Sequence, residues 1–157
     1  MDLLKFREAL GKFATGICLV TAEDPSLGSM AITVNSFASV SLEPALVLWS
    51  IQNTSEHANL FTKSPHFGIS ILSDQQQEIS AQYAKKGHHC VSPNQFSKGA
   101  YGEPKLIDAI AHFSCLLHAV YPGGDHQIIV GEVREFACFE EAPLIFYDGK
   151  YQRLSKT

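Results

Sequence analysis

The sequence has 157 residues, of which 45% are hydrophobic, and it carries a formal net charge of −4. This length is enough for one compact domain with a core and short for two, so we expect a single domain over residues 1–157. The 12 Lys and Arg residues are scattered along the chain. That pattern argues against nucleic acid as a partner, because binding to phosphate backbones needs a concentrated basic surface.

The sequence also argues against a membrane protein. No stretch approaches the roughly 20 apolar residues that a membrane span requires. The N-terminal segment MDLLKFREALGKF is amphipathic and lacks the order of a signal peptide, so we expect a cytoplasmic protein. The four cysteines form no CxxC pair, and we expect reduced, mostly buried thiols instead of disulfides or a zinc knuckle. They are Cys18, Cys90, Cys115 and Cys138.

The first predicted element is a helix. Leu3, Phe6, Leu10 and Phe13 recur at spacings of three and four residues, which places them on one face of a helix that ends near Gly16 and packs by that face. From residue 17 onward the chain changes to short β-rich runs separated by proline and glycine. The expected strands are ICLVT (17–21), MAITV (30–34), SFASVSL (36–42), ALVLWSI (45–51) and HFGISIL (66–72).

Two further helices are expected between the strands. One runs from a cap at Thr54 or Ser55 through Phe61, and the other follows a capping box of Ser73 and Gln76 and ends near residue 84. Residues 87–104 are rich in turn formers and polar groups. A loop of this length in a compact domain is usually functional or mobile.

The last third of the chain returns to strands. Expected strands cover 109–120 and 126–139, and a hairpin turning at Asp148 and Gly149 covers 143–154. Many short strands at close spacing favour a sandwich or barrel. We expect a mainly β protein, one antiparallel β-barrel with peripheral helices packed outside it.

Three segments carry the candidate chemistry. The first, TVNSFASVS (33–41), is dense in small hydroxyl and amide groups, which hydrogen-bond well to a polar heterocycle or a phosphate. An edge strand with Ser and Thr on its solvent face explains the same pattern equally well.

The second segment, SIQNTSEHAN (50–59), ends a strand and opens a helix, whose N-terminus suits an anionic phosphate. Ordinary helix capping by Thr54 or Ser55 is the alternative explanation. Lys85 and Lys86 would add cationic partners, or merely favour a helix C-terminus.

The third segment is PGGDHQ (122–127). Its two glycines permit a tight turn and leave room for a ligand to approach His126, although a histidine after a turn is often simply exposed. We expect no metal site, since His88, His89 and Cys90 are adjacent residues without a matching ligand cluster elsewhere. The sequence has no GxGxxG motif, so if the protein is an oxidoreductase, it does not hold a cofactor in a Rossmann fold.

Four blocks of the sequence together resemble the flavin reductase family of the split β-barrel, flavin-binding superfamily. They are FREALGKFATGICLVTA, TVNSFASVSLEPALVLWSI, GGDHQIIVGEV and PLIFYDGKYQRL, in the family's order, over about residues 3–154. The resemblance implies a homodimeric split barrel that takes hydride from NADH or NADPH and reduces FMN or FAD, with FMN favoured. It also implies a monooxygenase component that receives the reduced flavin.

The resemblance further implies roles for particular residues. The flavin-contacting segment corresponds to Asn35, Ser36, Phe37, Ala38, Ser39, Ser41 and Leu42, and the phosphate and ribityl segment to Gln52, Asn53, Thr54 and Ser55. Tyr83 and Lys85 match helix-end positions that reach the phosphates. The nicotinamide side corresponds to Gly124, Asp125 and His126, with Tyr151 as a further wall and His126 as the residue assigned to catalysis.

The chain departs from the family pattern at two places. Ala31 stands where many relatives have glycine, and the segment with His88, His89 and Cys90 has no family pattern. Two other functions remain compatible with the sequence. One is an electron carrier that keeps a tightly bound FMN without free-flavin turnover. The other is an enzyme acting on a pyridoxamine-type phosphate, which the GGDH block disfavours.

Overall fold

The computed structural model describes residues 1–155. The helices are α1 (Leu3–Gly11), α2 (Ala58–Lys63), α3 (Gln77–Tyr83) and a short 3₁₀ helix, η1 (Pro93–Gln95). The strands of the first half are β1 (Thr15–Gly16), β2 (Cys18–Asp24), β3 (Gly28–Val34), β4 (Ala38–Leu42), β5 (Ala45–Gln52) and β6 (His66–Ile71). Those of the second half are β7 (Phe96–Lys98), β8 (Pro104–Leu106), β9 (Ala111–Gly123), β10 (His126–Cys138), β11 (Ile145–Tyr147) and β12 (Lys150–Gln152).

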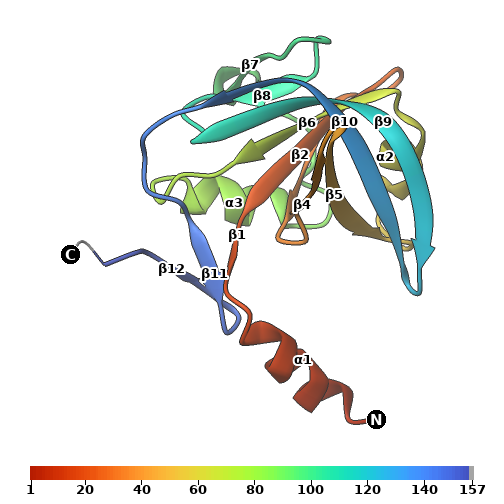
Figure 1. The fold of residues 1–157 in the computed structure, drawn as a ribbon. Helices are drawn as coiled ribbons and strands as arrows, with labels where there is room; N and C mark the ends of the chain where they lie inside the picture. Colours follow the sequence, from red (N-terminus) through yellow and green to blue (C-terminus); the bar gives the residue numbers. More distant parts are fainter. Residues whose placement is uncertain (156–157) are drawn as a thin grey trace.

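The body of the molecule is a seven-stranded antiparallel sheet in the order β3-β2-β6-β9-β10-β5-β4 (Figure 1). The edge strands β3 and β4 are consecutive in sequence and are joined by the three residues Asn35, Ser36 and Phe37. Four residue steps span at most about 14 Å, whereas seven flat strands would separate the two edges by about 29 Å. The sheet must therefore curve strongly. Within residues 1–155 no ladder joins β3 to β4, so the curved sheet stays open there.

The curved sheet is buried on both faces in its centre. Along β2, Cys18 and Val20 point into one core cluster, which also holds Trp49 and Phe67, and Leu19 points into the other. This follows from the two-residue period of a strand. The first cluster fills the inside of the sheet, where Trp49 meets Phe67 edge-on at 6.0 Å. The second cluster lies between β2, β3, α3 and the β11–β12 hairpin.

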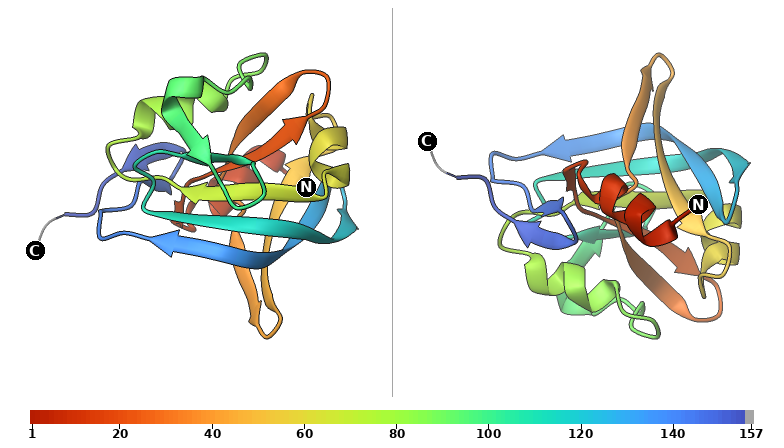
Figure 2. Two further views of the ribbon diagram at one scale, coloured as in Figure 1. Left: turned by 90° about the horizontal axis from the view of Figure 1, so that it is seen from above. Right: turned by 90° about the horizontal axis from the view of Figure 1, so that it is seen from below.

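The predicted strands are confirmed, with ends that differ by a few residues. The hairpin at Asp148 and Gly149 is also confirmed: both residues have positive φ, 51° and 75°. The two long strands β9 and β10 pair over 12 positions with two irregularities, and they form the longest hairpin in the described chain (Figure 2).

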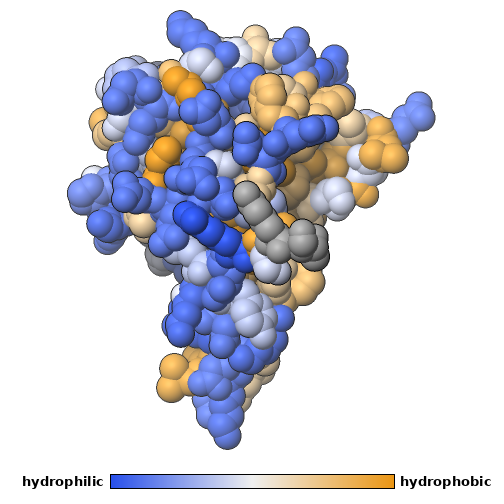
Figure 3. Space-filling view, turned by 90° about the vertical axis from the view of Figure 1, so that its left-hand side faces the viewer, coloured by the Kyte–Doolittle hydropathy of each residue, from blue (hydrophilic) through white to orange (hydrophobic). Residues whose placement is uncertain are grey.

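The N-terminal helix departs from the sequence-based prediction. It ends at Gly11, earlier than expected, because residues 15–16 pair with β11 as a short strand. Asp2 caps its start by accepting hydrogen bonds from the N–H groups of Leu4 and Lys5 at 3.1 and 3.2 Å. The prediction that it packs by its apolar face is wrong for residues 1–155, since every residue of the helix from Leu3 to Leu10 is exposed. Figures 1 and 3 show α1 projecting from the body, with hydrophobic side chains at its surface.

The other two helices begin later than predicted, and α2 also ends two residues later, at Lys63. Thr54 and Ser55 lie in a turn, and α2 starts only after His57, which makes no side-chain cap. Gln76 does accept from the N–H of Ser73 at 3.0 Å, which is half of the predicted capping box, but the helix begins at Gln77. Turn hydrogen bonds, from Ala58 to Ser55 and from Gln76 to Ser73, therefore replace the first turn of each predicted helix.

The segment 87–104 is ordered by hydrogen bonds and is not one long loop. It contains a bridge between Cys90 and Met30, the helix η1, and β7, which pairs with β8. Glu103, near the end of this segment, is buried and accepts hydrogen bonds from the hydroxyl of Ser114 and from the N–H of Tyr101. Burial alone would raise the pKa of Glu103, but these bonds and His112 lower the pKa to about 2, so the side chain is a carboxylate.

The cysteines divide into two pairs. Cys18 and Cys115 are buried, and burial raises the pKa of both thiols to about 12. Cys90 and Cys138 are exposed, so the expectation of mostly buried thiols holds for half of them. None of the helices in the described chain is both long and apolar enough to span a bilayer.

Candidate functional site

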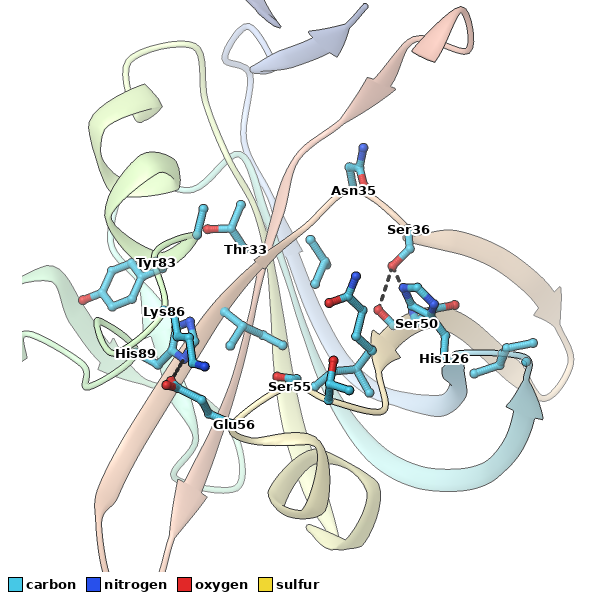
Figure 4. Close-up of a pocket in the computed structure, with 18 residues that line it drawn as sticks. Thr33, Asn35, Ser36, Ser50, Ser55, Glu56, Tyr83, Lys86, His89 and His126 are labelled. Atoms are coloured by element: carbon cyan, nitrogen blue, oxygen red, sulfur yellow. Dashed lines mark hydrogen bonds and ion pairs between the residues drawn. The ribbon is translucent and has the colours of Figure 1, made fainter. Parts of the chain in front are cut away.

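A pocket of about 760 Å³ lies at the ends of β3, β5 and β10 (Figure 4). Its walls come from the β3–β4 link, the turn after β5, the C-terminal end of α3 and the start of β10. This volume is in the range of about 300 to 1,000 Å³ that is typical of small-molecule sites. The lining residues are Ile32, Thr33, Val34, Asn35, Ser36, Ser50, Ile51, Gln52, Thr54, Ser55, Glu56, Tyr83, Ala84, Lys86, His89, Gly123, His126 and Ile128.

Ser36 fixes the β3–β4 link against β5. Its hydroxyl donates to the carbonyl of Ser50 at 3.2 Å and accepts from the N–H of Ser50 at 2.9 Å. The side chain of Ser36 thus extends the pairing of β4 with β5 by hydrogen bonds that the backbone of the link does not make. The neighbouring Phe37 turns inward and stacks on Phe113 at 5.8 Å, which leaves Asn35 at the rim of the pocket.

The turn after β5 is tied to the turn between β9 and β10. The backbone N–H of Asn53 donates to the carbonyl of Asp125 at 2.9 Å, and its side chain donates to the carbonyl of Gly124 at 3.2 Å. The side-chain amide of Gln127 in turn donates to Oδ1 of Asn53 at 3.0 Å. Asn53 therefore holds the two turns together from behind, while Gln52 and Thr54 face the pocket.

His126 is the first residue of β10 and lies on the same side of the pocket as Ser36 and Ser50 (Figure 4). Its Nδ1 is 2.6 Å from Oδ1 of Asp125. That hydrogen bond, with the accompanying charge interaction, lowers the pKa of Asp125. Because Asp125 engages Nδ1, the other ring nitrogen, Nε2, is the one available to a ligand.

The opposite wall is formed by the end of α3 and the segment after it. The Tyr83 ring is buried, and its hydroxyl is committed to Gln95 at 2.7 Å and to the N–H of Ser92 at 3.1 Å. The exposed Lys86 lines the pocket on this side. Nearby, Nδ1 of His89 is 3.4 Å from a carboxylate oxygen of Glu56. Burial, followed by the charge of His57, lowers the pKa of His89, so its imidazole is neutral at neutral pH.

The structure brings many of the predicted site residues together. Seven of them line the pocket: Asn35, Ser36, Gln52, Thr54, Ser55, Tyr83 and His126. Others support it from behind or beside it, and these are Phe37, Asn53, Lys85, Gly124 and Asp125. The remaining five lie elsewhere. Ala38, Ser39, Ser41 and Leu42 belong to the projecting β4, and Tyr151 is bonded through its hydroxyl to Ser80 at 2.9 Å.

Several lining residues were not singled out from the sequence. Thr33 and Glu56 lie inside segments that were recognised as polar, but nothing in the sequence ranks them above their neighbours. The apolar residues Ile32, Val34, Ile51 and Ile128 have the pattern of ordinary strand residues. Lys86 was named with Lys85 as a cationic partner for a phosphate, and it lines the pocket. His89 was considered only with His88 and Cys90, and the sequence does not connect it with Glu56, which is 33 residues away along the chain.

Comparisons with known proteins agree with these observations. Residues 10–155 match the family described as "Flavin reductase like domain". The FMN reductase (NADH) SmoA of Agrobacterium fabrum is 41% identical over 151 residues, covering 96% of this chain and 86% of that protein. The reductase subunit HsaB of a flavin-dependent monooxygenase from Rhodococcus jostii is 33% identical over 152 residues, covering 96% and 77%.

A similar solved structure is the NADH:FAD oxidoreductase SgcE6 of Streptomyces globisporus in complex with NAD and FAD fragments. It has a TM-score of 0.90 and 31% identity and covers 98% of this chain and 93% of that one. The resemblance drawn from the four sequence blocks is thereby confirmed, and the chain belongs to the flavin reductase-like domain family.

Proposed function

We propose that this protein is a flavin reductase that uses NADH to reduce FMN or FAD and supplies the reduced flavin to a monooxygenase component. The carrying observation is the pocket itself: two of the four family-like blocks, distant in sequence, contribute to its walls. Relatives named as NADH-dependent flavin reductases and as a monooxygenase reductase subunit support the activity and the partner. We propose FMN over FAD on the likeness to SmoA.

The residues of the pocket fit a flavin. Ile32, Val34 and Ile128 offer apolar surface to a planar ring system, and hydroxyl and amide groups around them offer hydrogen bonds to its polar edge. Lys86 supplies a positive charge at one end of the pocket, suited to a phosphate. A volume of about 760 Å³ leaves space for a second ring beside the first.

The bound cofactors supply the redox chemistry, a direct hydride transfer from the nicotinamide to the flavin ring. The chain's own residues bind and orient the two rings. The wall with Ser36, Ser50 and His126 is held rigid by hydrogen bonds between β5 and its neighbours. Asp125 orients the ring of His126 through Nδ1, and Nε2 would donate a hydrogen bond to the nicotinamide amide; no side-chain nucleophile or general base is needed.

We also propose a single split-barrel domain that forms a homodimer in the cytoplasm. The strongly curved, open sheet supports the split barrel. The unpacked apolar face of α1 supports the dimer, because an amphipathic helix that projects from its own chain gains stability by burying that face against a second copy. The two exposed free thiols, Cys90 and Cys138, suit a reducing compartment.

The activity is tested by steady-state oxidation of NADH with FMN or FAD in excess over the protein. We expect many turnovers per protein molecule and saturation with each flavin. NADPH in place of NADH gives the nicotinamide preference. A protein that keeps a stoichiometric flavin through dialysis and shows no turnover with free flavin would instead be an electron carrier. Absence of saturable flavin binding in a fluorescence titration overturns the proposal.

The two adjacent lysines provide a matched test of the phosphate end. Lys86→Ala should weaken FMN binding by about 1 kcal/mol, roughly fivefold, because an exposed ion pair contributes about that much. Riboflavin, which lacks the phosphate, should bind both forms equally. Lys85→Ala is the control, since Lys85 does not line the pocket. Fluorescence titrations of the wild type and both variants with FMN and with riboflavin measure the dissociation constants, and an equal effect of both substitutions would contradict the assignment to Lys86.

His126 is tested as a residue that positions the nicotinamide. Losing one hydrogen bond of about 1 to 3 kcal/mol corresponds to roughly 5- to 150-fold in kcat/KM for NADH. We expect His126→Ala to lower kcat/KM, mainly through KM for NADH, with flavin affinity little changed and partial recovery in His126→Gln. Unchanged kinetics would reduce His126 to a turn residue. Collapse of flavin binding would assign it to the flavin half of the pocket.

The dimer is tested with two exposed leucines. Leu10 on α1 is 59% exposed, and Leu27 in the β2–β3 turn is 64% exposed. Sedimentation of the wild type should give a mass near twice the 17.2 kDa of the chain. Leu10→Glu should shift the mass toward the monomer at micromolar concentration, because a charge would be buried in the contact, whereas Leu27→Glu should not. A monomeric wild type contradicts the proposal.

A further inference from the structure

Three potential metal ligands meet at the edge of the flavin pocket, outside the residues discussed for flavin and nicotinamide. The ligand atoms of Glu56, His57 and His89 all lie within 4.8 Å of one another. Nδ1 of His89 and Oε2 of Glu56 are 3.4 Å apart. Two ligands on a tetrahedral metal with bonds of about 2.0 to 2.1 Å are separated by about 3.3 Å. One pair therefore already has the required spacing.

The backbone holds each of the three residues in place. The carbonyl of His89 accepts from Ala31 on β3 at 2.8 Å, and the next residue bridges to Met30. The carbonyl of His57 accepts the first hydrogen bond of α2, from Phe61, at 3.1 Å. The Glu56 carboxylate accepts from the N–H of Gly87 at 3.0 Å. Little reorganisation is needed to bring the three donor atoms together.

His89 also has an unexplained polar atom. Its side chain is only 10% exposed, and its buried Nδ1 has no hydrogen-bond partner, because the approach to Glu56 lacks hydrogen-bond geometry. A buried nitrogen left in this way costs free energy unless something binds it. The rings of His57 and His89 meet edge to face at 5.0 Å, so both imidazoles converge on the same carboxylate.

We propose that Glu56, His57 and His89 form a binding site for one divalent transition-metal ion of the zinc class. Two imidazoles and one carboxylate are ligands that zinc accepts, and three protein ligands leave one position open to water or to a ligand in the pocket. Glu56 and His89 line the pocket beside Lys86, on the wall opposite His126 (Figure 4). A cation there would offset the negative charge of Glu56 at this end of the pocket.

The test measures metal binding directly, without flavin or NADH, so its result is independent of the proposed reductase activity. Untagged protein is stripped with a chelator and titrated with Zn²⁺ by calorimetry and with Co²⁺ by visible absorption. We expect one ion per chain with micromolar or tighter affinity and the intense visible bands of low-coordinate cobalt. A wild type that shows no saturable binding overturns the proposal.

Substitutions then locate the ion. His89→Ala and Glu56→Gln should each weaken Zn²⁺ binding by at least about tenfold, because even loss of a group that only supports a ligand costs about 10- to 100-fold. His118→Ala is the control, since His118 is an exposed histidine on β9 outside the cluster. Melting of the metal-free proteins checks folding, and Glu56→Gln carries the test if His89→Ala does not fold. Affinity unchanged in either folded variant contradicts the site.

Discussion

The structure depends on one covalent constraint, the three-residue link between β3 and β4. Because these strands are the two edges of a seven-stranded sheet, the link can be this short only if the sheet curves until its edges approach. The curvature brings the ends of β3, β5 and β10 to one place and opens the pocket between them. The side chain of Ser36 then hydrogen-bonds to the backbone of Ser50, so the link between the two edge strands also forms a wall of the site.

The two walls of the pocket are built differently. Ser36, Ser50 and His126 lie on or beside paired strands, where several backbone and side-chain hydrogen bonds fix them. Lys86 and His89 follow the end of α3, where the chain is held by bonds to β3 and by the Tyr83 hydroxyl. Under the function proposed above, the strand wall orients the two rings for hydride transfer, while the helix wall with Lys86 holds the flavin phosphate.

Strand positions and the hairpins could be predicted from the sequence because alternation and turn residues are local signals. The ends of the helices could not, because Thr54 and Ser55 satisfy capping rules in a turn that other contacts hold. The helix α1 was predicted from its spacing, but the prediction that it packs by its apolar face was wrong for the described chain. The spacing shows that a face is apolar and does not show what covers it, and within residues 1–155 that face is exposed.

The same distinction explains which site residues the sequence could supply. Asn35, Ser36 and His126 stand in segments with a strong local pattern, and the fold places all three at the pocket. Between Lys85 and Lys86 no local signal decides, because the choice depends on how the last turn of α3 is oriented against β3. Glu56 and His89 are 33 positions apart in the sequence. They come together where the segment after α3 hydrogen-bonds to β3. Adjacency of His88, His89 and Cys90 gave no reason to expect a metal site, whereas the cluster proposed above joins His89 to Glu56 and His57, which lie in the turn before α2.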